Sequence, residues 1–115
     1  MIDEDLVHQP ADGPLGAQYT AGEAWVVTAL GEADLQNLAP LADALTEAAG
    51  KHSVVVLDTA AVTFADSTFL NLLLRIRQLT DLRVAAPAAG LQRLLDVTGA
   101  NQVLTVRGTV ADAIS

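Results

Sequence analysis

Asp66, Ser67 and Thr68 are the residues best placed for chemistry, because they precede an apolar run with helical spacing. Aspartate is a preferred N-cap, since its carboxylate accepts hydrogen bonds from the N–H groups of the first helical turn. Ser67 would then occupy the first helical position and present its hydroxyl at the edge of a sheet. A hydroxyl at that position could be reached by a partner. The simpler interpretation is that the triplet only caps the start of a helix.

Other chemistry has weaker support in the sequence. The absence of cysteine excludes disulfides, thiol catalysis and thiolate metal sites. The two histidines, His8 and His52, lack metal-ligand spacing and are expected at the surface. Three acids, Asp34, Asp58 and Asp66, could gather around a divalent cation, but capping and turn roles explain them more simply. We therefore expect no catalytic residue, metal or cofactor, and a protein that is not an enzyme.

The elements expected to position the triplet follow an alternating order. Strands predicted over 15–19 and 24–30 would form an antiparallel hairpin around a turn. Further strands are expected over 53–58, 82–86 and 102–106, with helices over 37–50, 66–80 and 110–114 and one more ending at Gly99. This order predicts the α/β class: a single domain with a mixed β-sheet, an N-terminal hairpin and about four helices packed on it.

Local signals give three finer expectations. Residues 31–34 are predicted to break the strand before them, and Asn37 to cap the following helix, which Gly50 would end. The run 53–58 is β-branched and continuously apolar, which is typical of a strand covered on both faces. Ala61, Val62 and Phe64 are then expected in the loop that leads to Asp66.

The predicted helix after Asp66 is apolar over an unusually wide arc. Its apolar side chains, which include Leu70 and Leu74, span about 220°, against roughly 100° for a one-sided helix. Either a neighbouring helix covers the surplus, or a docking surface runs down the helix from Ser67.

Composition and charge limit the class of protein. The 115 residues are 51% apolar and 3% aromatic, which suits one domain with a sizeable core. The formal charge is −8, and residues 1–50 hold nine acids and no base, whereas 51–115 hold five acids and six bases. Such a balance argues against nucleic acid and anionic membrane surfaces as partners. We expect a flexible acidic leader over 1–14 and a folded domain over 15–115. Neither a signal peptide nor a membrane insertion is expected, so the predicted location is the cytoplasm.

The sequence resembles the STAS domain family, which includes anti-sigma factor antagonists and the cytoplasmic tails of sulfate transporters. The resemblance covers about residues 15–114. It is carried by Gly31-Glu32-Ala33-Asp34-Leu35, by Val55-Val56-Leu57-Asp58, by Val62-Thr63-Phe64-Ala65-Asp66-Ser67-Thr68 with Leu70 and residues 72–74, and by Leu94 to Gly99 with Asp96-Val97-Thr98.

The resemblance implies a switch in bacterial transcription regulation. An anti-sigma factor of the GHKL-type ATPase fold, which is also a serine protein kinase, would bind the unmodified protein and phosphorylate Ser67. This is partner switching, and the protein itself would be a monomer or weak dimer. The partner-binding residues carried over or adjacent are Asp34, Asp66, Ser67, Thr68, Leu70, Asn71 and Leu74. A phosphate on Ser67 would be tolerated in the free domain because N–H groups and the helix dipole face it. In an interface with Asp66, and with Asp34 and Asp58 near by, it would be repelled.

Two departures from the family pattern leave a second hypothesis open. Phe69 and Asn71 stand where the family has glycines, which permit close backbone approach. The alternative is therefore an accessory STAS subunit of another assembly, such as a lipid-transport complex or a stressosome-like sensor, in which Ser67 stays unmodified. In either case the acidic first half predicts a partner with basic residues around a hydrophobic groove.

Overall fold

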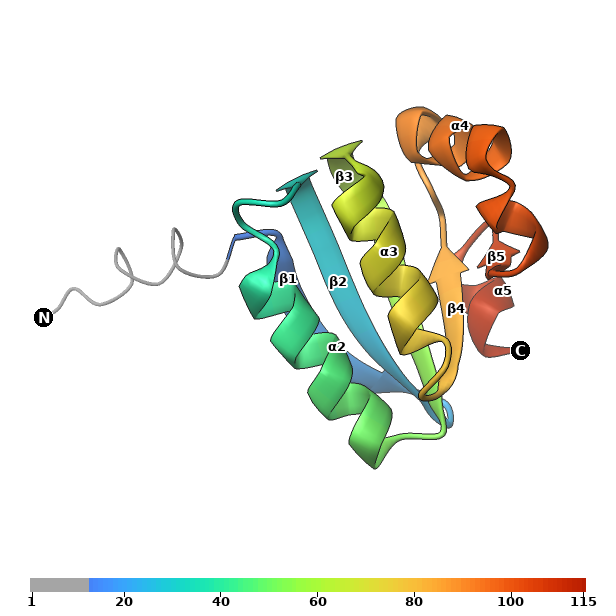
Figure 1. Cartoon of the computed structure of the whole chain (residues 1–115). Coiled ribbons are helices and arrows are strands. Elements are labelled where there is room, and N and C mark those ends of the chain that lie inside the picture. Colours follow the sequence, from blue (N-terminus) through green and yellow to red (C-terminus); the bar gives the residue numbers. More distant parts are fainter. Residues whose placement is uncertain (1–12) are drawn as a thin grey trace, which may run out of the picture.

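One mixed sheet of five strands, in the order β1-β2-β3-β4-β5, forms the frame of the molecule (Figure 1). β1 (Leu15–Ala21) and β2 (Ala24–Ala33) make the antiparallel hairpin, and β3 (Val54–Ala65), β4 (Asp81–Ala85) and β5 (Thr105–Arg107) extend it in parallel. The computed structural model describes residues 13–115, so residues 1–12 of the predicted leader lie outside it. The predicted α/β class and N-terminal hairpin are confirmed.

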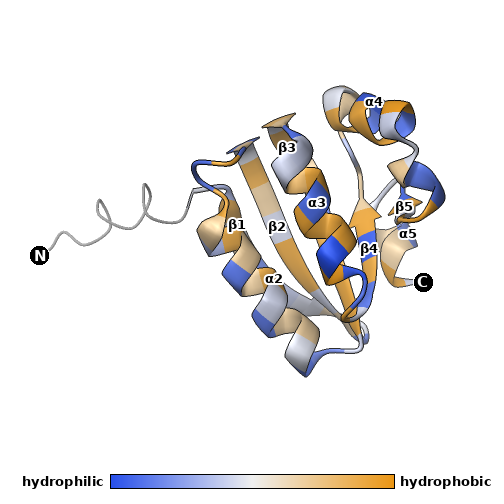
Figure 2. Ribbon diagram, in the orientation of Figure 1, coloured by the Kyte–Doolittle hydropathy of each residue, from blue (hydrophilic) through white to orange (hydrophobic). Residues whose placement is uncertain are grey.

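The helices follow the strands as expected. α2 (Ala39–Lys51) and α3 (Ser67–Ile76) lie side by side on one face of the sheet, and α4 (Ala89–Thr98) crosses one end (Figure 1). A 3₁₀ turn, η1 (Ala100–Gln102), precedes β5, and α5 (Val110–Ile114) packs on the other face. Thr109 caps α5, as predicted, by accepting a hydrogen bond from the Asp112 N–H at 3.0 Å. Apolar colours run along the central strands, while hydrophilic residues lie mainly on helices and turns (Figure 2).

β3 is covered on both faces near its start, as its sequence predicts. Val55 and Leu57 belong to the large core beneath the helices, whereas Val56 belongs to a smaller cluster beneath α5. All three side chains are fully buried. Alternate side chains of a strand point to opposite faces, so a continuous apolar run is what a strand between two layers requires.

β2 and β3 are longer than the sequence predicts. The expected break at 31–34 and the expected loop containing Ala61, Val62 and Phe64 both belong largely to strands, because parallel pairing continues to Ala33 and Ala65. The pairing carries two register irregularities, and Gly31 adopts a φ of +72° between them. A bulge with glycine in the left-handed region keeps two strands paired while the register changes. The signals that predicted a break and a loop therefore mark bulges.

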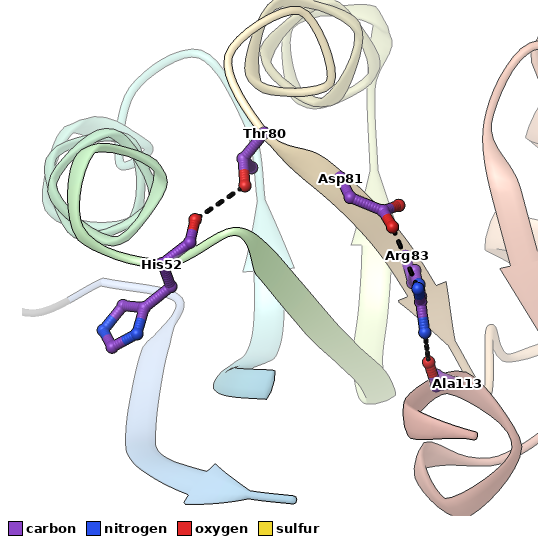
Figure 3. Close-up of polar contacts among 5 residues, drawn as sticks. All are labelled: His52, Thr80, Asp81, Arg83 and Ala113. Atoms are coloured by element: carbon purple, nitrogen blue, oxygen red, sulfur yellow. Dashed lines mark hydrogen bonds and ion pairs between the residues drawn. The ribbon is translucent and has the colours of Figure 1, made fainter. Parts of the chain in front are cut away.

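The helix boundaries also differ in places. α3 ends at Ile76 instead of Thr80, since the Gln78 and Leu79 N–H groups donate to carbonyls three residues back. The Thr80 hydroxyl beyond them donates to the His52 carbonyl at 2.8 Å (Figure 3). α2 begins after Leu38 instead of Asn37 and runs through Gly50. α4 ends as predicted, with Gly99 in the left-handed conformation.

Contacts at the end of the sheet opposite Ser67 are mainly polar and aromatic. Arg83 donates to Asp81 at 2.9 Å and to the Ala113 carbonyl at 2.7 Å, and so attaches α5 to β4 (Figure 3). The Trp25 and His52 rings stack with centroids 4.9 Å apart, at 5° between their planes. The indole N–H donates to the Gln18 side chain at 3.0 Å. The stack and this hydrogen bond connect β1, β2 and the segment between α2 and β3.

Candidate functional site

The first turn of α3 is built around the Asp66 carboxylate. Asp66 is the N-cap, and its Oδ1 accepts hydrogen bonds from the N–H groups of Thr68 at 3.0 Å and Phe69 at 3.2 Å. Ser67 is the first helical residue and is exposed. Its hydroxyl makes no hydrogen bond with any residue between 13 and 115, so it is free to be approached from solvent.

The second oxygen of Asp66 connects α3 to the loop between β2 and α2. Oδ2 accepts a hydrogen bond from the Leu35 N–H at 3.2 Å, across 31 positions of sequence. A carboxylate that satisfies donors from two segments holds them in a fixed relation. Asp66 is thus both a helix cap and a tertiary bridge, and only the first of these roles follows from local sequence.

The loop at 34–38 is braced by its own side chains. Asn37 accepts from the Asp34 N–H at 3.0 Å and donates to the Glu32 carbonyl at 2.8 Å, which replaces its predicted role as a helix cap. Asp34 in turn accepts from the Gln36 N–H at 3.0 Å. These bonds place Asp34 next to Leu35 and hence beside Asp66. They also present the Leu35 side chain to solvent, with 72% of it exposed.

The first turn offers a phosphate fewer donors than expected. The N–H groups of Thr68 and Phe69 are taken by the Asp66 carboxylate, and the Leu70 N–H donates to the Asp66 carbonyl at 3.2 Å. An anion at Ser67 would therefore compete with Asp66 for the same donors. The helix would therefore compensate a negative charge on Ser67 less than a first turn with free N–H groups would.

The prediction that Leu70 belongs to an exposed apolar surface on α3 is wrong. This side chain is only 6% exposed and belongs to the core, and Leu74 is half-buried against it. The wide apolar arc is covered by the sheet and by α2, which was the other interpretation offered by the sequence. Of the remaining predicted contact residues, Thr68 is half-buried and Asn71 is exposed, one turn below Ser67 on the same side of the helix.

Asp58 does not join the site. It is the fifth residue of the twelve in β3, where it pairs with Thr28 and Ala85, whereas Ser67 follows the far end of that strand. Asp58 directly follows Leu57, whose side chain belongs to the main core beneath the helices. Because successive side chains of a strand point to opposite faces, the Asp58 side chain lies on the face opposite the helix layer. Within residues 13–115, no three acidic or histidine side chains form a group suited to a metal ion. No helix of that region is long and apolar enough to cross a bilayer.

Exposed apolar side chains flank Ser67 at places that the sequence did not indicate. They are Leu35, whose N–H binds Asp66, and Phe64 and Val97, 53% and 78% exposed, which line a groove between the end of β3 and α4. Helical periodicity could not find them, because two lie on a loop and a strand end and Val97 lies off the buried face of α4. These exposed apolar side chains thus lie on segments next to the start of α3 and not along α3 itself.

Two substitutions of Asp66 should separate its roles. Asp66→Ala removes both cap and bridge, and we expect it to lower the free energy of unfolding by about 1–2 kcal/mol. Asp66→Asn retains one acceptor oxygen for the helix N–H groups but places an amide NH₂ opposite Leu35, so it should cost less while freeing the loop. Urea denaturation gives the stabilities, and amide hydrogen exchange at Leu35 reports the bridge. Unchanged exchange at Leu35 in both variants would contradict the bridging role.

Leu70 and Leu35 offer a direct comparison of a buried and an exposed leucine. Leu70→Ala should lower the free energy of unfolding by about 2–4 kcal/mol, because it leaves a cavity in the core. Leu35→Ala should change it by about 0.5 kcal/mol or less. Both are measured by urea denaturation. Equal effects would mean that the core does not extend to the first turn of α3.

Comparison with known proteins adds family and fold. The model of the family described as "Mlab, STAS domain" matches residues 17–106. An anti-sigma factor antagonist from Mycobacterium paratuberculosis is 24% identical, with a TM-score of 0.78 over 85% of this chain and 88% of that one. A second solved structure, from Thermotoga maritima and described as a "putative anti-sigma factor antagonist", is 13% identical, with a TM-score of 0.78 over 85% of this chain and 90% of that one.

A third solved structure is the anti-sigma factor antagonist SpoIIAA in its unphosphorylated form. It is 18% identical, with a TM-score of 0.69 over 87% of this chain and 92% of that one. No curated protein matches the sequence significantly. At these identities the structural likeness establishes a shared fold.

Proposed function

The chain belongs to the STAS domain family, and from that premise we propose that it is an anti-sigma factor antagonist. Its partner is an anti-sigma factor that is also a serine kinase of the GHKL-type ATPase fold. The unmodified protein binds this partner, and phosphorylation of Ser67 ends the binding. The protein acts by binding, in the cytoplasm, and is not itself an enzyme.

The observation that supports this function most is the setting of Ser67. Its hydroxyl is exposed and without a hydrogen-bond partner among the described residues, at the start of a helix beside the Asp66 carboxylate. Around it lie exposed apolar side chains at Leu35 and Phe64 and the acid Asp34. A kinase can reach such a hydroxyl, and an interface formed there must bury whatever charge the hydroxyl carries.

Electrostatics gives the direction of the switch. A phosphoserine carries about −1.5 to −2 charges at neutral pH. In the free domain this charge is hydrated, but in a docked interface it would be desolvated beside the Asp66 carboxylate. Buried like charges that lose water cost several kcal/mol, which corresponds to orders of magnitude in affinity.

Phe69, one of the two departures from the family glycines, does not obstruct this surface. Its side chain is fully buried in the core beneath α3, so it points away from a partner approaching Ser67. The concern that a phenylalanine blocks a kinase therefore carries little weight in this structure.

The other departure favours the second candidate function, an accessory STAS subunit of another assembly. Asn71 is exposed one turn from Ser67 and on the same side, where a glycine would let a kinase backbone approach closely. A side chain there suits a partner that docks on α3 without modifying Ser67.

Incubation with the anti-sigma kinase and ATP distinguishes the two functions. The kinase to use is the one encoded beside this gene or captured with it, then purified. Under the proposed function, intact-mass measurement shows the gain of one phosphate on wild type and none on Ser67→Ala. Stable binding without a gain in mass would support the accessory subunit. The absence of both binding and a mass gain would exclude this kinase as the partner.

A further inference from the structure

β3 extends well beyond its neighbour β4. The two strands pair only from Val54 to Asp58 of β3, after which β4 ends at Ala85. β3 continues to Ala65 and is paired there with β2 alone. Alternate residues of a parallel strand direct their N–H and C=O groups to opposite neighbours. Within the described part of the chain, no strand receives the groups that point away from β2.

A groove separates this strand edge from α4. It encloses about 370 Å³, and its walls are the end of β3 at residues 62–65 and one side of α4. The walls are apolar, since they include Phe64, Leu94 and Val97. Gly90 has no side chain and leaves open space on the helix side of the groove, with nothing within 4 Å of where a Cβ would be. A groove between a strand edge and a helix is the architecture with which several domains bind an extended peptide as an added strand.

One positive charge lies at this groove. Arg93 lines it and forms no ion pair or hydrogen bond with residues 13–115. The acid nearest in sequence, Asp96, accepts from Gln92 at 2.9 Å and Asn101 at 3.0 Å, which are contacts along the helix and toward η1. The groove thus offers one unpaired cation and no acidic side chain in its lining.

We propose that this groove binds an extended segment of the anti-sigma factor as an additional strand beside β3, with an apolar side chain between Phe64 and Val97 and a carboxylate paired with Arg93. The inference rests on the proposed function. Backbone groups that no described strand pairs with favour an extended backbone as the occupant, because an apolar small molecule has no N–H and C=O ladder to offer. Ala65 ends the groove wall and precedes Asp66 and Ser67 directly, so one partner can engage both places.

Charge changes in the groove test the contact with the purified anti-sigma factor. Val97→Glu and Arg93→Glu should each weaken binding at least tenfold. The matched controls are Val103→Glu and Arg107→Glu, which introduce the same changes at exposed positions outside the groove, and these should stay within threefold. Circular dichroism and urea denaturation confirm that each variant is folded. In hydrogen exchange, complex formation should slow the amides of residues 62–65 that face α4.

The outcomes separate this inference from the proposed function. If the anti-sigma factor binds wild type and all four variants equally, the groove is not used, and the proposed function stands. If it does not bind wild type at all, both fail. The chain has no cysteine, so Val97→Cys can carry a single photo-crosslinker. Crosslinking to an extended acidic segment of the anti-sigma factor supports the inference, whereas crosslinking only to residues 1–12 or to a second copy overturns it.

Discussion

Ser67→Glu is expected to lower the affinity for the anti-sigma factor at least a hundredfold, which corresponds to about 2.7 kcal/mol. The substitution places a permanent negative charge next to the Asp66 carboxylate, which already uses the N–H groups of Thr68 and Phe69. When the partner covers the site, both charges lose water. Ser67→Ala removes only an exposed hydroxyl and should keep the affinity within about threefold. Isothermal titration calorimetry with the purified partner measures both.

A control is needed because the chain is already strongly acidic. Ser53→Glu adds the same charge to an exposed serine before β3, at the end of the sheet opposite Ser67. It should leave the affinity nearly unchanged, and added salt should narrow the difference between the two variants. Equal losses from Ser53→Glu and Ser67→Glu would show that net charge, and not the site, governs binding.

Phe69→Gly is expected to have the largest effect on stability, although it restores the residue common in the family. Phe69 is among the largest fully buried side chains of the described domain. Emptying such a site costs about 3–5 kcal/mol, and glycine within a helix adds about 1 kcal/mol. This is a large part of the 5–15 kcal/mol typical of a whole domain. We expect partial or complete unfolding, detected by circular dichroism and urea denaturation.

Asn71→Gly is the matched experiment at the second departure. Asn71 is exposed, so only the difference in helix propensity is lost, about 0.5 kcal/mol or less. Should a partner kinase phosphorylate Asn71→Gly faster than wild type, Asn71 would be identified as a steric filter at the docking face. Comparable losses of stability in the two glycine variants would contradict the burial of Phe69.

Much of the fold follows from local physical chemistry. The β-branched run at 54–57 predicts a strand buried on two faces, and the structure confirms it. Asp66, Thr109 and Gly99 mark two helix starts and a helix end, because side-chain oxygens satisfy first-turn N–H groups and glycine adopts positive φ without strain. These signals act within a few residues and can therefore be read from one sequence.

What could not be predicted depends on contacts between distant segments. Bulges that let β2 and β3 stay paired resemble a break and a loop in sequence. Leu70 is buried in the core that the sheet and several helices share, and periodicity alone cannot say which neighbour covers a wide apolar arc. The bond from Leu35 to Asp66 joins residues 31 positions apart. The site was therefore predicted at Ser67 and its cap, but its apolar surroundings were not.

The stacked pair of Trp25 and His52 has a practical consequence for all of these experiments. Trp25 is the only tryptophan, and it lies near the start of β2, whereas the site lies beyond the strand ends at Ala33 and Ala65. Its fluorescence should change when the stack separates on global unfolding and should be insensitive to a partner seated at Ser67. Trp25 fluorescence should therefore report whether the domain is folded, independently of whether a partner is bound at Ser67.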